Sequence, residues 1–339
     1  MKKQFIIIIS LFLYLFSYSQ KSLDSDLLYA DQSPMEIKLN YSNKNMKKNT
    51  TDSTFIKTDL NYYYKEKWNT IPVSLRARGN FRRAKCYFPP IKMKIKKSQY
   101  KNTIFDGNKS LKLVLPCRIE DEKNDNILKE YIAYKIYELI SPYHFKTRRV
   151  NIEFTEPKGK KVKTFSLKWF LIEDDSKLEK RFGGKVVEQF VHPLAMQDLS
   201  SVQHAFFQYL IGNTDFSIAY QHNGKVLYDS KTFLPLPYDF DMTGWVDPSY
   251  GFGNPTLKLS SLTERRFRGF KRDNELMNNV RKQFVDSKDE ITSLLDSFKS
   301  QFDNEDEFEN MYSFMLEFYK IIEDDSKFDK LILKQARTK

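Results

Sequence analysis

The feature that most restricts the fold of this chain is a change of hydrophobic period after the first third of the sequence. In IKMKIKK, Ile91, Met93 and Ile95 share one face of an extended chain, and lysines share the other. Such alternation is typical of strands with one buried face. Similar patterns predict further strands at residues 35–41, 55–64, 70–80 and 110–116. Residues 35–116 are therefore expected to form an antiparallel, β-rich unit.

The apolar residues that follow recur at helical spacing. Residues 126–140 carry Leu128, Ile132, Ile136 and Leu139 on one helical stripe, and a proline follows the stretch. Two more strands are expected at residues 148–154 and 164–174. The helical spacing of residues 126–140 therefore predicts one helix embedded in the β-rich half of the chain.

The remainder of the chain is predicted to be mainly helical. A helix is expected to begin at a capping box formed by Ser200 and Gln203 and to stop at Gly212. A short hairpin is predicted in residues 226–241, and amphipathic helices from Asp273 onward. The boundary between the two halves is expected near residues 175–190.

The N-terminus has the pattern of an export signal. A positive MKK precedes the apolar run FIIIISLFLYLF, and small residues follow at cleavage spacing. The run is shorter than a membrane span of about 20 residues. Residues 1–19 are predicted to be a signal peptide, leaving no membrane span in a periplasmic or extracellular protein. In an oxidising compartment Cys86 and Cys117 form either a disulfide or two buried thiols.

Composition limits the partners of the protein. The 339 residues are 40% hydrophobic, which is enough apolar material for a substantial core, and their length suits two lobes. The formal net charge of +12 favours anionic partners such as nucleotides or acidic proteins. Lysines are dispersed among carboxylates rather than gathered in one basic arm, so nucleic-acid binding is not expected.

Polar residues of the stretch IGNTDFSIAYQHNGK are candidates for chemistry. Asp215 follows the end of a predicted buried helix, where it is either a general base on a rigid support or an Asx-turn residue. Asn223 is either an oxygen ligand for a hard cation, with His222 nearby, or part of an Asn-Gly hairpin turn. The other histidines are scattered, so no zinc site is expected.

Two carboxylates follow in LPLPYDFD. Asp239 and Asp241 stand at i and i+2, so on a strand they share one face and suit Mg²⁺ or Ca²⁺. They are equally compatible with helix caps or exposed turn acids.

Basic residues earlier in the chain could meet phosphate. Lys92 and Lys94 lie on the polar face of a predicted strand, where lysines are either solvated or point into a cleft. Glu130, on the predicted helix, is either exposed or paired with such a lysine. Arginines at 76, 78, 82 and 83 extend the positive surface.

The order of these residues suggests phosphoryl transfer. A strand lysine, a helix glutamate, a loop aspartate with a downstream asparagine, and a strand-end aspartate follow one another along the chain. Phosphoryl transfer needs such groups, because its catalysis is mostly positioning and charge neutralisation.

The same residues carry a resemblance to a known family. RARGNFRRAKCYFPPIKMKIKK, LKLVLPCRIEDEKNDNILKEYIAYKIYELISPYHFKTRRVNI, KWFLIEDD, IGNTDFSIAYQHN and PYDFD occur in family order over about residues 70–245. In these stretches the chain resembles the spore-coat protein H (CotH) kinase family of atypical protein kinases. The resemblance implies an α+β, two-lobed protein-kinase-like fold, with a β-rich N-lobe at 20–180 containing one embedded helix, and a mainly helical C-lobe with a C-terminal extension at 181–339.

The resemblance also implies an activity, which is ATP- and Mg²⁺-dependent phosphorylation of Ser or Thr in an exported or cell-surface protein. Its site residues would be the catalytic Asp215, the phosphate-binding Lys92 or Lys94 with Glu130 as partner, the adenine-contacting hinge of Leu171, Ile172 and Glu173, and the metal ligands Asn223, Asp239 and Asp241. Position 220, five residues after the catalytic aspartate, is tyrosine, so the metal asparagine would be Asn223.

Two other functions remain open from the sequence. The first is a catalytically inactive, kinase-like exported scaffold that binds an acidic protein or a cell-surface glycan through Arg78, Arg82 and Arg83. The second is a metal-dependent hydrolase that uses Asp239, Asp241 and His222, although no activated nucleophile is evident for it.

Overall fold

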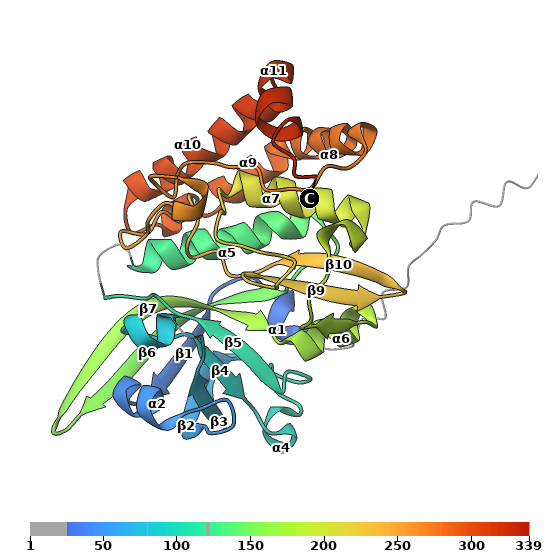
Figure 1. Ribbon diagram of the computed structural model, residues 1–339. Helices are drawn as coiled ribbons and strands as arrows, with labels where there is room; N and C mark the ends of the chain where they lie inside the picture. The colour runs from blue at the N-terminus through green and yellow to red at the C-terminus, as the bar shows by residue number, and fades with distance from the viewer. Residues whose placement is uncertain (1–25, 80, 120–122, 339) are drawn as a thin grey trace, which may run out of the picture.

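The protein consists of a β-barrel beneath a layer of helices, with a small sheet at their junction (Figure 1). The computed structural model describes residues 26–79, 81–119 and 123–338. The predicted signal peptide at residues 1–19 lies outside them. None of the helices in the described ranges combines the length and the apolar character needed to cross a membrane.

Seven strands form the closed barrel, in the order β1-β2-β3-β4-β5-β7-β6. Neighbouring strands are antiparallel except at the closure, where β1 pairs in parallel with β6 and Met35 lies opposite Val150. The strands are β1 (Met35–Asn40), β2 (Ile56–Tyr64), β3 (Lys67–Ala77), β4 (Ile91–Lys94), β5 (Ser110–Val114), β6 (Thr147–Lys158) and β7 (Lys161–Glu173).

Alternation along each strand decides which side chains fill the barrel. On β4, Ile91 and Met93 are buried inside, and Lys94 is exposed outside, as the sequence predicted. The end of β7 is buried on both faces. Leu171 packs inside the barrel, whereas Phe170 and Ile172 pack against the helices. This strand therefore joins the two hydrophobic cores of the molecule.

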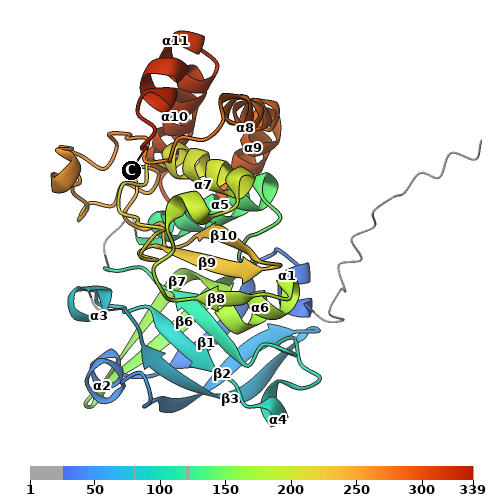
Figure 2. The same ribbon diagram turned by 45° about the vertical axis from the view of Figure 1, so that its right-hand side comes forward.

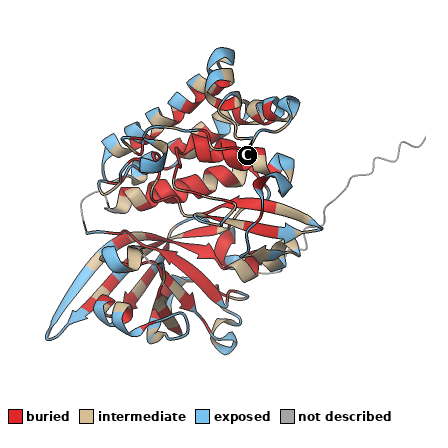
Figure 3. Ribbon diagram, viewed as in Figure 1, coloured by how far each residue is buried: buried red, intermediate tan, exposed pale blue. Residues whose placement is uncertain are grey.

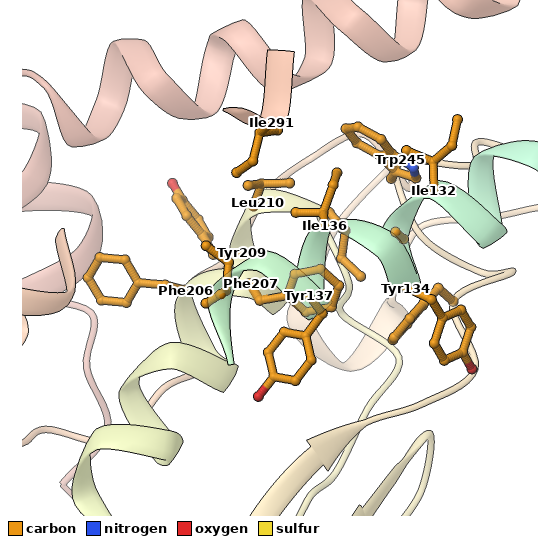
Figure 4. Close-up of a cluster of buried hydrophobic side chains, with 14 of the residues drawn as sticks. Ile132, Tyr134, Ile136, Tyr137, Phe206, Phe207, Tyr209, Leu210, Trp245 and Ile291 are labelled. Atoms are coloured by element: carbon orange, nitrogen blue, oxygen red, sulfur yellow. The ribbon is translucent and has the colours of Figure 1, made fainter. Parts of the chain in front are cut away.

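The helices α5 (Lys123–Ile140) and α7 (Asp198–Leu210) form the centre of the upper layer and are buried along most of their length (Figure 3). Their side chains meet in one cluster that also includes Trp245 and Ile291 (Figure 4). The helical spacing predicted in residues 126–140 is confirmed. The capping box is wrong, because α7 begins earlier and the Gln197 side chain accepts a hydrogen bond from the backbone N–H of Ser200.

The small sheet contains the predicted hairpin. It has the order β10-β9-β8, with β8 (Lys185–Val187), β9 (Gly224–Asp229) and β10 (Thr232–Pro237). The hairpin turns at Ser230 and Lys231, which both have positive φ, and not at Asn223-Gly224.

The other helices surround these elements, and α2 and α3 lie beside the barrel (Figure 2). They are α1 (Leu27–Ala30), α2 (Asn43–Asn49), α3 (Phe81–Lys85), α4 (Lys97–Tyr100), α6 (Asp175–Phe182), α8 (Asn274–Asp286), α9 (Lys288–Asp296), α10 (Glu305–Ile322) and α11 (Asp325–Phe328). Short helical turns occur at Pro193–Ala195, Pro255–Leu257, Lys299–Gln301 and Asp329–Leu333.

The predicted two-lobed, protein-kinase-like fold is wrong. The first half of the chain closes into a seven-stranded barrel, and the second half combines helices with the small sheet. Helix α5 follows β5 and precedes β6 in the chain, as predicted, and it packs against β6 and β7 of the barrel as well as against the C-terminal helices. Alternation shows which side chains face inward. It does not show which strand edges meet, so the pairing of β1 with the distant β6 has no local signal.

Candidate functional site

The loop after α7 holds Asp215 in a defined position. Its backbone N–H donates to Asn213 Oδ1 at 2.9 Å, so the residue does stand in an Asx turn. Asn223 Nδ2 donates to the Asp215 carbonyl at 2.6 Å and to its carboxylate at 3.1 Å, and His222 Nε2 lies 3.3 Å from the other carboxylate oxygen. The Asp215 side chain remains 49% exposed. The carboxylate is therefore oriented from several sides and still accessible.

Asp239 and Asp241 lie just beyond the end of β10 rather than on a strand face. Asp239 has a φ of 64°, which is unusual for a residue other than glycine, and its backbone N–H donates to the Tyr134 hydroxyl at 3.0 Å. The Asp239 carboxyl group lies beside that of Asp241. Burial, together with the neighbouring Asp239, raises the pKa of Asp241 to about 6, although Arg82 opposes the shift. A strained backbone thus brings two carboxyl groups together.

Arg82 and Glu130 complete this carboxylate cluster. Arg82 Nε lies 3.5 Å from Asp241 Oδ2. Glu130, on α5, is 1% exposed, and its Oε1 has no hydrogen-bond partner in the described part of the chain. Burial and the charge of Asp241 raise the pKa of Glu130 well above its usual range. An orphaned buried oxygen of this kind marks a place where a water or cation would be held.

A small cavity of about 20 Å³ adjoins these groups. Its lining includes Arg82, Arg118, Glu130, Asp241 and Tyr250. That volume accommodates about one water molecule or one metal ion.

The disulfide between Cys86 and Cys117 braces the same region. It joins the segment after α3, which carries Arg82, to the segment after β5. The Tyr87 backbone N–H also donates to the Cys117 carbonyl at 2.7 Å. Of the two states left open by the sequence, the disulfide is the one present.

A second group of charges lies beside Asp239. The Arg78 guanidinium donates to the Tyr238 hydroxyl, and Lys112 Nζ lies 4.5 Å from the centre of the same ring. Lys112 pairs with Asp175. Burial lowers the pKa of Lys112 and Arg78 adds to that effect, whereas the pairing with Asp175 opposes it.

Lys92 connects to this group through the next carboxylate. Its Nζ lies 3.0 Å from Asp174 Oδ2, not beside Glu130 as predicted. Burial opposes ionisation of Asp174, but Lys92, Ser176 and Lys112 together outweigh it and the pKa falls to about 2. Lys94 lies elsewhere, with its ammonium 4.4 Å from the centre of the Phe55 ring.

The predicted hinge does not have free backbone groups. Leu171 and Ile172 lie between β5 and β6 and pair with both strands. Glu173 is fully buried and pairs with Arg181. Because neighbouring strands engage these residues, their backbone is not placed to contact adenine.

The structure therefore brings Asp215, Asn223, Asp239, Asp241 and Glu130 into one region, and the charge of Asp215 contributes to the raised pKa of Asp241. The sequence did not identify Lys112, Tyr134 and Tyr238 as part of it. The signal for Lys112 was present, because it interrupts the otherwise apolar SLKLVLP.

The donor set fits a hard divalent cation only in part. Among the residues that the structure describes, no group of three or more His, Cys, Asp or Glu side chains is arranged to hold a metal ion. Mg²⁺ commonly takes one or two protein carboxylates together with substrate phosphates and water. The neighbouring carboxyl groups of Asp239 and Asp241 could supply those one or two ligands.

The fold and the site together define a barrel-and-helix protein with a carboxylate and arginine centre at the junction of its layers. In comparisons with known proteins, the sequence matches no family model and no curated protein.

Proposed function

We propose that this protein transfers a phosphoryl group from Mg²⁺-bound ATP to a hydroxyl group of a protein substrate. The observation that carries the proposal is the convergence of Asp215, Asp239 and Asp241 beside Arg78 and Arg82. The proposal rests on the chemistry of this site and not on a kinase fold, since one chemistry can be supported by unrelated folds.

Each group suits one part of that reaction. Asp215 is oriented and accessible, as a residue that accepts the proton of an attacking hydroxyl must be. Asp239 and Asp241 would hold Mg²⁺, which neutralises phosphate charge. Arg78 and Arg82 supply fixed positive charge beside these carboxylates, where phosphate oxygens would lie. Asn223 supports Asp215 in this scheme, because its amide N–H groups are directed at that residue.

The substrate is proposed to be an exported or cell-surface protein, and this protein to act in the periplasm or outside the cell. The sequence pattern of residues 1–19 supports export. The Cys86–Cys117 disulfide supports an oxidising compartment.

Transfer of labelled γ-phosphate from ATP to dephosphorylated casein tests the proposal. Asp215→Asn and Asp239→Asn are each expected to lower the rate by about a hundredfold or more, the size of a lost acid–base or charge-stabilising group. Asp59→Asn is the matched control, since Asp59 is an exposed aspartate on β2. Addition of EDTA should abolish transfer. Transfer at the parent rate by correctly folded Asp215→Asn and Asp239→Asn proteins would refute the assignment.

The scaffold alternative finds less support. It requires Arg78, Arg82 and Arg83 at a free surface, whereas each of these side chains is engaged within the protein. Arg83 donates to the carbonyls of Lys47 and Thr50. The hydrolase alternative requires His222 beside Asp239 and Asp241, but His222 lies against Asp215.

A further inference from the structure

A second cavity lies on another side of α5 from the carboxylate cluster. It measures about 320 Å³ and is enclosed by α5, the β6–β7 hairpin and the turn at residues 300–303. Leu128 and Tyr131 of α5 face this cavity, whereas Glu130 and Tyr134 face the carboxylates. Its volume is in the range of small-molecule sites.

Arg149 is the central polar group of this cavity. Its guanidinium lies 5.5 Å from the centre of the Tyr131 ring and 4.9 Å from that of Phe298. One N–H group donates to Gln301 Oε1. Nε is buried and has no hydrogen-bond partner among the described residues. The guanidinium therefore has its faces against aromatic rings and part of its donor edge unused.

No carboxylate of the described chain pairs with Arg149 in a salt bridge. Burial lowers its pKa, Tyr131 opposes the shift, and the nearby Arg148 adds to it. Lys168, the other cation of the lining, is already paired, because its Nζ lies 2.5 Å from both Asp303 Oδ1 and the Gln301 carbonyl. Arg149 is therefore the uncompensated charge, and a partly buried charge without a counter-ion is costly.

The rest of the lining is largely apolar. Pro34, Ile127, Leu128, Tyr131 and Phe302 contribute surfaces that suit a hydrocarbon or aromatic body. A planar guanidinium with free N–H groups matches a carboxylate in a bidentate arrangement. Because Lys168 is already paired, Arg149 is the one cation of the described lining that a ligand would meet. One such cation and an apolar wall fit a singly charged ligand better than a nucleotide, which carries several negative charges.

We propose that this cavity binds a small organic carboxylate with an aromatic or other apolar body, whose acid group pairs with Arg149. The site is separate from the proposed phosphoryl-transfer centre and does not depend on it.

Titration with 2-naphthoate, followed by ligand-observed saturation-transfer NMR, tests the proposal. The neutral isostere 2-naphthamide is the companion probe. The acid is expected to bind about tenfold or more tightly than the amide, the usual value of a charge-assisted hydrogen bond. Arg149→Gln should remove that preference and leave amide binding unchanged. Lys163→Gln, which removes an exposed cation from the same hairpin, should leave the affinity for the acid within about twofold of the parent value.

A second variant acts from the opposite wall. Ser300 is exposed at the rim of the cavity, so Ser300→Trp fills the space without disturbing the core and should abolish binding of both probes. This variant decides the question if Arg149→Gln does not fold. The proposal is overturned if the parent protein binds neither probe, if it binds acid and amide equally, or if 2-naphthoate binds Arg149→Gln or Ser300→Trp as tightly as the parent.

Discussion

Replacement of Arg82 by methionine should destabilise the protein by an amount that depends on pH. The side chains of Arg82 and Asp241 are only 12% and 11% exposed, and their charged atoms approach to 3.5 Å. At an effective dielectric constant of about 20, two unit charges at this distance attract by roughly 5 kcal/mol. That figure is the upper limit of the loss.

Protonation of Asp241 reduces the loss. Its pKa is already raised to about 6, so neutralising this carboxyl group at pH 7 costs only about 1 kcal/mol. Once Arg82 is removed, the group takes up a proton rather than remaining charged and unpaired. Arg82 also donates to the Leu115 carbonyl at 2.7 Å, and loss of that bond adds about 1 kcal/mol. The expected total near neutral pH is about 2–3 kcal/mol.

The sign of the pH effect follows from the direction of the pKa shift. A carboxyl group whose folded pKa lies above its unfolded value of 3.8 binds protons more tightly in the folded state, so stability falls as pH rises from about 4 to 6. Removal of Arg82 raises this pKa further and extends the decline above pH 7. The loss caused by Arg82→Met should therefore be about 1 kcal/mol at pH 5 and about 2–3 kcal/mol at pH 7.5.

Urea denaturation followed by tryptophan fluorescence at the two pH values measures these losses. Arg76→Met is the control, because Arg76 pairs with Asp52, whose side chain is 96% exposed, and such pairs contribute about 1 kcal/mol or less. Adding Asp241→Asn to Arg82→Met should remove the pH dependence. An Arg82→Met loss that is equal at both pH values, or below about 0.5 kcal/mol at pH 7.5, would refute the reasoning.

Three further predictions concern single features of the structure. Burial lowers the pKa of His204 to about 3, so below pH 6.5 the unfolded chain takes up a proton that the folded protein does not. The parent should therefore lose stability between pH 7 and pH 5, and in urea titrations His204→Gln should lose about 2 kcal/mol less than the parent over that range. The Cys86–Cys117 disulfide spans a sequence separation of 31, so replacing both cysteines by serine should lower the free energy of unfolding by about 3–4 kcal/mol. A reducing agent should lower the melting temperature of the parent but not that of the double serine variant. Tyr134→Phe leaves the Asp239 N–H without its acceptor and should cost about 1–3 kcal/mol in the same urea assay, with an unchanged stability arguing against that hydrogen bond.

Local patterns predicted the elements of this fold but not their assembly. The alternation of Ile91 and Met93 identified a strand because it depends on one strand alone. Closure of the barrel depends on Met35 meeting Val150, and nothing near either residue in the sequence specifies the other. The kinase-like arrangement was implied by the resemblance of short sequence stretches, which do not specify how the strands pair.

The candidate site shows the same limit. The sequence singled out Asp215, Asp239 and Asp241, because carboxylates beside apolar runs are conspicuous, and the structure brings them together. From the sequence, Glu130 was predicted to pair with a lysine, whereas Arg82 is the cation beside it. A pairing of this kind depends on where two distant segments meet.

The buried charges around α5 argue that this region serves more than the fold. Arg82, Glu130 and Asp241 are little exposed, and an apolar group of similar volume in place of such charges is often neutral or stabilising. Lys129, on the same helix, shows the structural alternative, because it is fully used in an ion pair of 2.6 Å with Glu307 that ties α5 to α10. Among the described residues, Glu130 Oε1 has no hydrogen-bond partner, and an unsatisfied buried oxygen raises the free energy of the folded state. A group that weakens the fold and lies beside two aspartates is better explained by a bound ion or substrate than by packing.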